Sequence, residues 1–195
     1  MKDARLARAH EHMNFWQGKL VRLRGVEPSD AETFARWNED SETARELDFV
    51  WPPISLARMR KDTEEASLKK LEEDAFFWVV EDATGTAVGH IATHKCNHRS
   101  GVFRYGLSIA REHRRRGYAT EAALIVLKYY FEELRYQKCL VGVHGNNPAS
   151  VAHHEKLGFR LEGTLRRMVY TGGQFFDSYH YGMLKEEWEQ SPLRF

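Results

Sequence analysis

The fold is decided by the stretch Arg111-Glu-His-Arg-Arg-Arg-Gly-Tyr-Ala-Thr-Glu-Ala122, a basic segment in a chain of 195 residues. Immediately before it, apolar side chains occupy every second position from Phe103 to Ile109, which predicts a strand. Immediately after it, apolar residues recur at helical spacing from Ala123 to Leu134, which predicts a strongly amphipathic helix. The first N–H groups of a helix lack internal partners and the helix dipole favours an anion. This strand-turn-helix segment is therefore a candidate phosphate site.

The residues of the basic turn suit an anion in two ways. Gly117 lets the backbone approach a ligand closely, and the small residue Ala119 keeps the same path open. Arg114, Arg115 and Arg116 supply positive charge and forked donors. The turn is neither a Walker-type loop nor a dinucleotide fingerprint, because Gly-Lys-Ser/Thr and the three-glycine pattern are both absent. A solvated arginine face and a nucleic-acid patch are the alternatives that the run alone leaves open.

Composition narrows the class of protein. The 29 basic and 28 acidic residues give a net charge of +1, which argues against bulk nucleic-acid binding. Hydrophobic residues make up 42% of the chain, enough for one packed domain. Cys96 and Cys139 belong to no CxxC pair, so we expect buried free thiols in a reducing cytoplasm. We expect neither a signal peptide nor a membrane span, because no apolar segment has the necessary length.

Periodicity and turn residues predict a single domain. We expect helices after the Glu27–Asp30 turn, which supplies an N-cap, then over residues 55–72, from the basic turn to residues 133–136, and from Asn147 to Gly158. We expect strands over residues 21–24, 76–81, 88–96, 102–110, 138–144, 159–170 and 175–184. The strand-helix-strand order from residue 102 to 144 predicts one parallel pair in a mostly antiparallel sheet, an α/β (α+β) fold. We expect residues 1–18 to form an N-terminal extension, 19–190 the domain, and 191–195 a C-terminal tail.

Two groups of residues match a family pattern. The turn Arg114-x-x-Gly117-x-Ala119, between a strand and a long helix, is similar to the acetyl-CoA signature of the GNAT superfamily of N-acetyltransferases. The later residues that follow the pattern are Asn147–Ser150, Glu155–Phe159, Glu162, Gly163, Arg166, Gly173 and Asp177. They resemble the branch of ribosomal-protein N-terminal acetyltransferases, which also holds spermidine acetyltransferases and antibiotic-modifying enzymes. The resemblance extends from about Leu20 to Trp188.

The resemblance implies a fold and a donor. The fold is a sheet whose central parallel strands splay apart, with helices on both faces. The donor is acetyl-CoA, used without a metal. Its pyrophosphate would lie on Arg114, Arg115, Arg116, Gly117, Tyr118, Ala119 and Thr120, and its pantetheine arm along Leu107, Ser108 and Ile109. The implied reaction is direct attack of a neutral primary amine on the thioester, with a backbone N–H stabilising the oxyanion.

Two residues of the Asn147 segment have competing interpretations. Asn147 would hold pantetheine amides, or would only cap its helix. Ser150 would protonate the leaving thiolate, or would only bond to the backbone of the first helical turn. Both residues are expected to contact the cofactor if the family roles apply.

The general base is less constrained. Ribosomal-protein enzymes of this branch can use a glutamate on the strand after Gly163, where this chain has Val169. The candidate bases are therefore Tyr170, His180 and His94, beside a water chain to solvent.

The acceptor is expected to be a small-molecule amine or a peptide N-terminus. Candidate acceptor-binding residues are Trp37, Glu39 and Trp51. The acidic residues Glu39, Asp40, Glu42 and Glu46 favour a cationic acceptor, with plain surface charge as the alternative. We expect no nucleic-acid or membrane partner, and the pattern does not distinguish a monomer from a homodimer.

Three histidines are evenly spaced in the segment predicted as a strand over residues 88–96 and just after it. His90, His94 and His98 repeat every four residues, which on a helix would resemble a metal face. On a strand this spacing separates the side chains by about 13 Å, so we expect no metal site.

Two other functions stay open. Val169 leaves open a catalytically silent coenzyme A-binding module. The arginine run leaves open a nucleic-acid-binding protein, which would bind with strong salt dependence.

Overall fold

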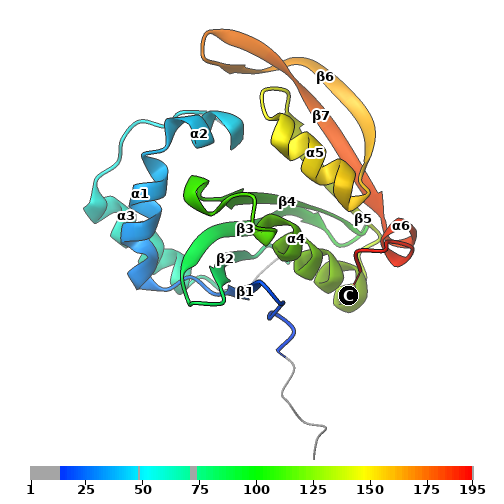
Figure 1. Cartoon of the computed structure of the whole chain (residues 1–195), viewed down its shortest axis with the longest axis horizontal. Coiled ribbons are helices and arrows are strands. Elements are labelled where there is room, and N and C mark those ends of the chain that lie inside the picture. Colours follow the sequence, from blue (N-terminus) through cyan, green and yellow to red (C-terminus); the bar gives the residue numbers. More distant parts are fainter. Residues whose placement is uncertain (1–13, 48, 71–73, 195) are drawn as a thin grey trace, which may run out of the picture.

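A computed structural model describes residues 14–47, 49–70 and 74–194 (Figure 1). This part of the chain forms one seven-stranded sheet in the order β1-β2-β3-β4-β5-β7-β6. The strands are β1 (Val21–Arg24), β2 (Phe77–Asp82), β3 (Ala87–Asn97), β4 (Val102–Ile109), β5 (Lys138–His144), β6 (Arg160–Thr171) and β7 (Gln174–Leu184). Neighbouring strands are antiparallel except β4 and β5, which are parallel. The predicted fold class is therefore confirmed.

Helices cover both faces of this sheet. They are α1 (Ala31–Asn38), α2 (Ser41–Leu47), α3 (Leu56–Ser67), α4 (Tyr118–Lys128), α5 (Pro148–Leu157) and α6 (Lys185–Glu189), and Figure 1 shows α1 to α3 grouped together, away from α5. On one face, Phe34 of α1 lies 6.1 Å from Phe77 of β2, measured between ring centroids. On the opposite face, Tyr130 stacks on Phe103 of β4 at 4.1 Å. No helix of the described residues is long and apolar enough to cross a membrane.

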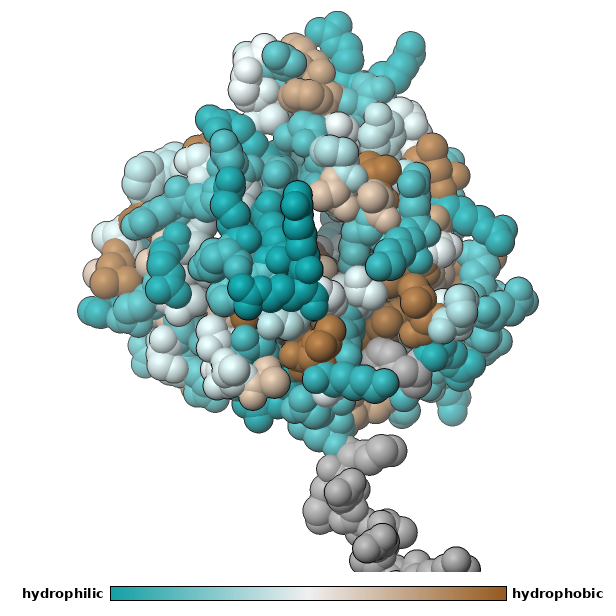
Figure 2. Space-filling view, in the orientation of Figure 1, coloured by the Kyte–Doolittle hydropathy of each residue, from teal (hydrophilic) through white to brown (hydrophobic). Residues whose placement is uncertain are grey.

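The α4 helix is more deeply buried than its sequence pattern predicts. Each residue from Ala122 to Leu127 is at most 6% exposed, so apolar contacts surround the helix instead of forming one stripe. After Lys128 the helix widens into a π-helical turn, Tyr129–Glu133, which reaches the predicted end. With these apolar groups inside, hydrophobic residues form only scattered patches on the face seen in Figure 2.

One carboxylate joins α4 to the first strand. Glu121 accepts hydrogen bonds from the backbone N–H groups of Lys19, Leu20 and Val21, at 2.9, 2.6 and 2.7 Å. These bonds satisfy donors just before and at the first residue of β1, and they fix the first turn of α4 against the sheet edge. The phosphate-site candidate is therefore attached to the edge of the sheet.

Several predicted helix boundaries differ from the observed ones. The sequence interpretation missed α2 and α6, and α3 ends at Ser67 instead of Glu72, which lies outside the described residues. The carboxylate of Asp30 does not cap α1: it accepts from Arg24 at 2.8 Å and from the N–H of Glu27 at 2.9 Å. Ion pairing with Arg24 thus replaces the expected cap.

Aromatic residues before residue 18 belong to the core. Trp16 lies 5.2 Å from Trp78 and 4.7 Å from Tyr129, and Phe15 lies 5.8 Å from Tyr129, between ring centroids. The expected boundary of the domain at residue 19 stays a prediction, although these two residues on its N-terminal side pack against the core. The remaining residues of the expected N-terminal extension, 1–13, are outside the described part of the chain. The expected C-terminal tail also stays a prediction, although Leu193 packs against the core.

Candidate active site

The central parallel strands separate at the middle of the sheet. Pairing between β4 and β5 is confined to Val102–Arg104 and Lys138–Leu140, after which β4 continues to Ile109 beside β3 alone. Among the described residues, the β5 side of β4 from Tyr105 to Ile109 therefore has no strand partner. Unpaired backbone groups of this kind can bind an extended ligand as an added strand. The expected divergence of these strands agrees with this pairing, and Leu107, Ser108 and Ile109 lie on the open edge.

The basic turn adjoins the end of that edge and opens α4. Gly117, the N-cap of α4, has φ +86°, a left-handed conformation that favours glycine. Arg115 is also left-handed, at φ +63°. The first N–H with a helical acceptor is that of Glu121, which bonds the Gly117 carbonyl at 3.1 Å. The N–H groups of Tyr118–Thr120 therefore lack helical acceptors, as an anion site requires.

The three arginines of the turn have different surroundings. Arg114 points toward α2, where its guanidinium donates to Glu46 at 3.0 Å and to the Thr43 hydroxyl at 2.7 Å. It also donates to the carbonyl of Ile109 at 3.1 Å. Protein acceptors thus occupy this guanidinium, and the expected contact of Arg114 with a phosphate stays a prediction. Arg115 and Arg116 are exposed, and Arg116 donates to the Glu112 carbonyl at 3.2 Å.

The start of α5 is tied to the end of α2. The Asn147 side chain caps α5 by accepting from the N–H of Ser150 at 2.9 Å, so its capping role is confirmed. Its amide NH₂ donates to the carbonyl of Glu46 at 3.2 Å, a use that the sequence did not predict. The Ser150 hydroxyl lies 3.3 Å from Nδ1 of His154, and that nitrogen donates to the Ser150 carbonyl oxygen at 2.8 Å. His154 is buried, and burial lowers the pKa of its imidazole.

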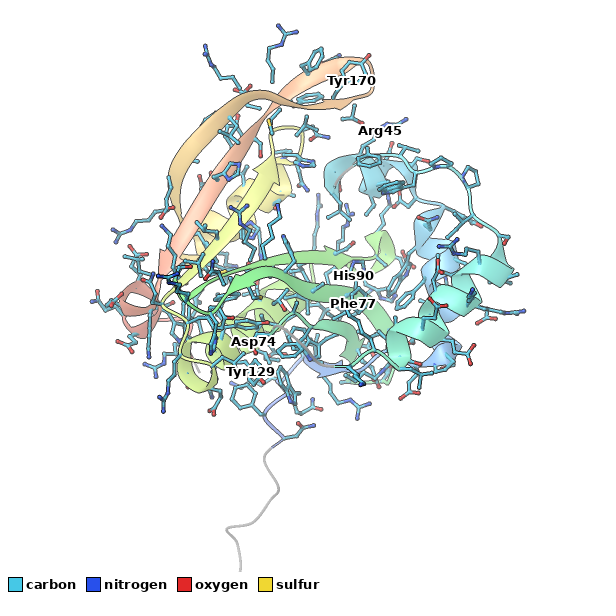
Figure 3. All side chains as sticks on the ribbon, turned by 180° about the vertical axis from the view of Figure 1, so that it is seen from behind. Arg45, Asp74, Phe77, His90, Tyr129 and Tyr170 are labelled. Carbon is cyan, nitrogen blue, oxygen red and sulfur yellow. The ribbon has the colours of Figure 1, made fainter. Side chains whose placement is uncertain are left out.

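The predicted bases do not converge on one place. Tyr170 is 60% exposed and packs on Phe175 in the β6–β7 hairpin, which projects away from the His90 region in Figure 3. His180 lies on β7 opposite Gly142, with its Nε2 3.5 Å from the Ser178 hydroxyl. His94 is exposed on β3, and Val169 lies opposite Phe176 in the hairpin. The structure thus separates Tyr170 from the open edge of β4 because the hairpin extends beyond the sheet.

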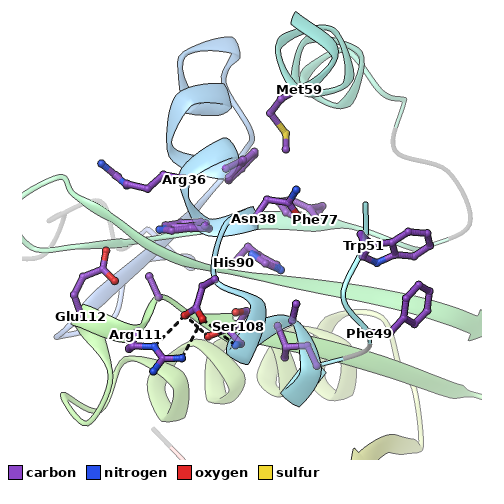
Figure 4. Close-up of a pocket in the computed structure, with 17 residues that line it drawn as sticks. Arg36, Asn38, Phe49, Trp51, Met59, Phe77, His90, Ser108, Arg111 and Glu112 are labelled. Carbon is purple, nitrogen blue, oxygen red and sulfur yellow. Dashed lines mark hydrogen bonds and ion pairs between the residues drawn. The ribbon is translucent and has the colours of Figure 1, made fainter. Parts of the chain in front are cut away.

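A cavity of about 330 Å³ lies between α1–α2 and the β2–β4 part of the sheet (Figure 4). We call it the acceptor pocket, after the role proposed for it below. Most of its lining is aromatic or aliphatic: Phe34, Trp37, Ala44, Leu47, Phe49, Trp51, Met59, Phe77, His90 and Ala110. Polar and charged groups complete the lining, namely Arg36, Asn38, Asp40, Thr43, Ser108, Arg111 and Glu112. Trp37 and Trp51 are thus in the pocket, whereas Glu39 is not part of its lining.

The expected acidic cluster is bonded to the basic turn. Asp40 accepts from Arg111 at 3.0 and 3.1 Å, and Arg111 also pairs with Glu42 at 2.6 Å. Hydrogen bonding from Arg111 lowers the pKa of Asp40 well below its usual range. Since Glu46 pairs with Arg114, three of the four acidic residues have arginine partners. The expectation that this cluster favours a cationic acceptor is not supported by these pairings.

His90 lines the acceptor pocket, where the sequence interpretation did not place it. Its imidazole stacks on Phe77 at 5.2 Å with an interplanar angle of 15°, and it lies 6.3 Å from Trp37. Burial lowers its pKa to about 4, so the ring is neutral at pH 7. The four-residue histidine spacing directed attention to metals, but no group of three or more His, Cys, Asp or Glu in the described ranges could hold an ion. The usable signal was the alternation of side chains along β3, which could have placed His90 on the same face of the sheet as Phe77.

Comparison with known proteins agrees with this geometry. The family model described as acetyltransferase (GNAT) domain matches residues 21–160. The "SPbeta prophage-derived uncharacterized N-acetyltransferase YokL" of Bacillus subtilis (strain 168) is 36% identical over 177 residues, covering 91% of this chain and 97% of that protein. The crystal structure of a probable acetyltransferase aligns with a TM-score of 0.75 at 26% identity, covering 88% of this chain and 96% of that one.

A further solved structure shares the fold. It is the spermidine N-acetyltransferase from Vibrio cholerae in complex with CoA and spermine, with a TM-score of 0.75, 22% identity, and coverage of 87% of this chain and 98% of that one. The family match spans most of the sheet, the basic turn and α5. The chain therefore belongs to the GNAT family of acetyltransferases and is an N-acetyltransferase.

Proposed function

We propose that this protein transfers an acetyl group from acetyl-CoA to a primary amine by direct attack within a ternary complex. One observation carries the proposal: the open edge of β4 leads directly to the N-terminus of α4. An extended amide-bearing arm needs a free strand edge, and a pyrophosphate needs unpaired N–H groups with positive charge nearby. The chain offers both within residues 105–120.

The donor-binding roles follow from that arrangement. Leu107, Ser108 and Ile109 would pair with the pantetheine arm, and the N–H groups of Tyr118, Ala119 and Thr120 would bind the pyrophosphate. Gly117 supplies the left-handed turn that directs these groups outward, and Arg115 and Arg116 supply the charge. Arg114 positions the turn by binding the Ile109 carbonyl and α2. Acetyl-CoA supplies an activated thioester, which an amine attacks without a covalent enzyme intermediate.

The residues around the transfer point handle charge and protons. The nitrogen of a neutral amine forms a bond to the acyl carbon, and the carbon–sulfur bond breaks as the thiolate leaves. A backbone N–H of the Leu107–Ile109 segment stabilises the oxyanion. The Ser150 hydroxyl gives its proton to the thiolate and regains one from solvent, while the Nδ1–H of the adjacent His154, which donates to the Ser150 carbonyl, orients the hydroxyl oxygen. The amine's surplus proton leaves to a base or water; His94 and His180 stay predictions for this role.

Calorimetry and a thiol-release assay test the proposal. Acetyl-CoA is expected to bind, and amine-dependent release of coenzyme A is expected to follow. Failure to bind acetyl-CoA at near-millimolar concentration would refute the donor site. Binding without turnover across peptides, polyamines and other amines would instead favour the silent coenzyme A-binding module that Val169 suggested.

Finer assignments are part of the same proposal. The segment Asn147–Phe159 supports the ribosomal-protein branch, where the acceptor would be a protein N-terminus. A small-molecule amine is supported by the pocket volume of about 330 Å³. The cytoplasm remains the proposed location, supported by two cysteines that are free thiols.

A further inference from the structure

We infer that the acceptor is a primary amine carried on a flat aromatic body, which lies in the acceptor pocket with its nitrogen beside His90 and Ser108. This inference rests on the proposed function and names its substrate class. Three features support it: a continuous aromatic wall, a lining without excess negative charge, and a polar end that adjoins the open edge of β4.

The wall consists of rings in contact. Phe34 lies 5.6 Å from Trp37 and 6.1 Å from Phe77, and the imidazole of His90 stacks on Phe77 at 5.2 Å. Such a surface favours offset or edge-to-face contact with another ring. The pocket volume of about 330 Å³ suits a one- or two-ring amine.

A second pair of rings stands at one end of the same pocket. Phe49 and Trp51 lie 4.2 Å apart, and they remain 43% and 59% exposed. Figure 4 places them at the end opposite Arg111 and Glu112. These two exposed rings form an apolar surface beside the cavity, and contact with an apolar ligand would bury that surface favourably.

Charge in the lining does not suit a polycation. The pocket has two carboxylates, Asp40 and Glu112, and two guanidinium groups, Arg36 and Arg111. The carboxylate of Asp40 is bonded to Arg111 and to Thr43. Several cationic centres along a polyamine would therefore meet no matching row of free carboxylates, whereas one amine on an aromatic body needs no such row.

Beside Ser108, the pocket wall contains an imidazole that has no hydrogen-bond partner among the described residues (Figure 4). His90 is paired with Ser108 across β3 and β4, and Ser108 belongs to the open edge proposed for the thioester. Within the described ranges His90 makes ring contacts but no hydrogen bond, and its nitrogens are not among the fully buried unpaired atoms. A neutral imidazole can accept a hydrogen bond from an amine N–H. The aromatic wall thus leads an amine toward the transfer point.

A panel of acceptors tests the inference on the full chain with acetyl-CoA. The probes are 2-phenylethylamine, tryptamine, butylamine and spermidine, and the readout is kcat/KM from thiol release. Both aromatic amines are expected to exceed butylamine and spermidine by at least about tenfold. Preference for spermidine, parity with butylamine, or no turnover of either aromatic amine would overturn the inference. None of these results would refute the proposed function, which fails only if acetyl-CoA does not bind or no amine is acetylated.

Variants separate the wall from the donor site. Trp37→Ala is expected to lower kcat/KM for 2-phenylethylamine at least about tenfold. The Kd for acetyl-CoA should stay within about threefold, which also shows that the variant is folded. The matched control is Phe175→Ala, which removes a ring that is 53% exposed on the distant hairpin and should change neither quantity. Equal losses in both variants would contradict a pocket-specific role.

His90 has its own test. His90→Phe keeps a ring in the wall but removes the nitrogen that accepts the hydrogen bond from the amine. For 2-phenylethylamine, kcat should therefore fall at least about tenfold while KM changes less than about threefold. His90→Gln retains an amide oxygen and should recover part of kcat. An unchanged kcat in His90→Phe would overturn the contact between this imidazole and the amine.

Discussion

The proposed donor side and the proposed acceptor side of the active site are built in opposite ways. The donor side uses the backbone of one continuous stretch, residues 105–120, whose open strand edge and unpaired helix N–H groups need few particular side chains. The acceptor pocket uses side chains from α1, α2, α3, three strands and the segment that carries Phe49 and Trp51. A site made from local backbone is encoded in a short motif, whereas a site made from distant side chains depends on the completed fold.

The two sides meet in the basic run itself. Arg115 and Arg116 face outward at the donor side, but Arg111 and Arg114 bind acidic residues of α2 and its N-cap. The basic run is therefore divided between two exposed arginines at the proposed anion site and two arginines in an ion-pair network. The difference between these roles gives experiments that separate the two sides.

The largest expected effect lies on the donor side. Gly117→Asp should weaken acetyl-CoA binding by at least about 100-fold, or about 2.7 kcal/mol. The residue has φ +86°, a Cβ there would lie 3.0 Å from Leu20, and the new carboxylate would repel the pyrophosphate. Calorimetric titration with acetyl-CoA measures the change.

Gly173→Asp is the matched control for this prediction. Gly173 is also left-handed, at φ +78°, but it lies in the β6–β7 turn with open space around its Cβ position. Strain should be similar and the Kd for acetyl-CoA unchanged. If both variants bound acetyl-CoA equally well, the anion site would not be at the start of α4.

The next largest effect distinguishes Arg114, which should matter for stability, from Arg115 and Arg116, which should matter for binding. Arg114→Ala should lower the free energy of unfolding by about 2 kcal/mol, because it removes bonds to Glu46, Thr43 and the Ile109 carbonyl. Thermal or urea denaturation measures this loss. The Kd for acetyl-CoA should change less than in the double variant Arg115→Ala/Arg116→Ala.

That double variant is the converse case. Both side chains are exposed, so the free energy of unfolding should change by no more than about 0.5 kcal/mol. Acetyl-CoA binding should weaken by about tenfold or more and become less sensitive to salt. The proposed division of roles within the basic run would be wrong if Arg114→Ala weakened acetyl-CoA binding more, and stability less, than the double variant does.

The sequence was most informative where structure is local. Strand alternation before Arg111, the glycine at position 117 and the Asn147–Pro148 helix start each follow from neighbouring residues, and each element appears as predicted. The parallel pair also followed, because a strand-helix-strand unit leaves little topological choice. The α2 helix was missed although Asp40 is its N-cap, accepting from Thr43 at 3.1 Å, and Asp-x-x-Thr before a helical run was a usable signal.

Features that depend on long-range packing could not be read in the same way. The pairing of Arg114 with Glu46 joins residues 68 positions apart, so the basic run looked uniformly available for an anion. His90 was judged by its spacing from other histidines, whereas its role depends on Phe77 and Trp37 from other elements. Tyr170 was a candidate base in the sequence, but in the structure it is exposed on the β6–β7 hairpin, away from His90 (Figure 3).

A smaller effect concerns pH on the acceptor side. The pKa of His90 is about 4 in the folded chain and about 6.5 when unfolded, so between these values the unfolded chain binds more protons. Stability should therefore fall as the pH drops from 6.5 toward 4. After discounting for partial exposure, His90 should account for on the order of 1 kcal/mol of the loss between pH 7 and 5.

Urea unfolding at these two pH values measures that contribution. His90→Gln should lose less stability than the wild type, whereas His153, whose pKa is also lowered to about 4 by burial, should keep its contribution in both proteins. An identical loss in wild type and His90→Gln would mean that the imidazole is not desolvated in the pocket wall.

The smallest effect tests how the two sides share Arg111. Glu42 pairs with Arg111 at 2.6 Å but is 70% exposed, so Glu42→Gln should change the free energy of unfolding by less than about 0.5 kcal/mol. Asp40 is 28% exposed and also accepts from Thr43, so Asp40→Asn should cost more, about 1 kcal/mol. Urea denaturation at low and high salt compares them, and only the Glu42→Gln difference should vanish at 1 M salt. Equal costs would show that the pocket wall depends on net charge instead of on the hydrogen-bonded position of Asp40.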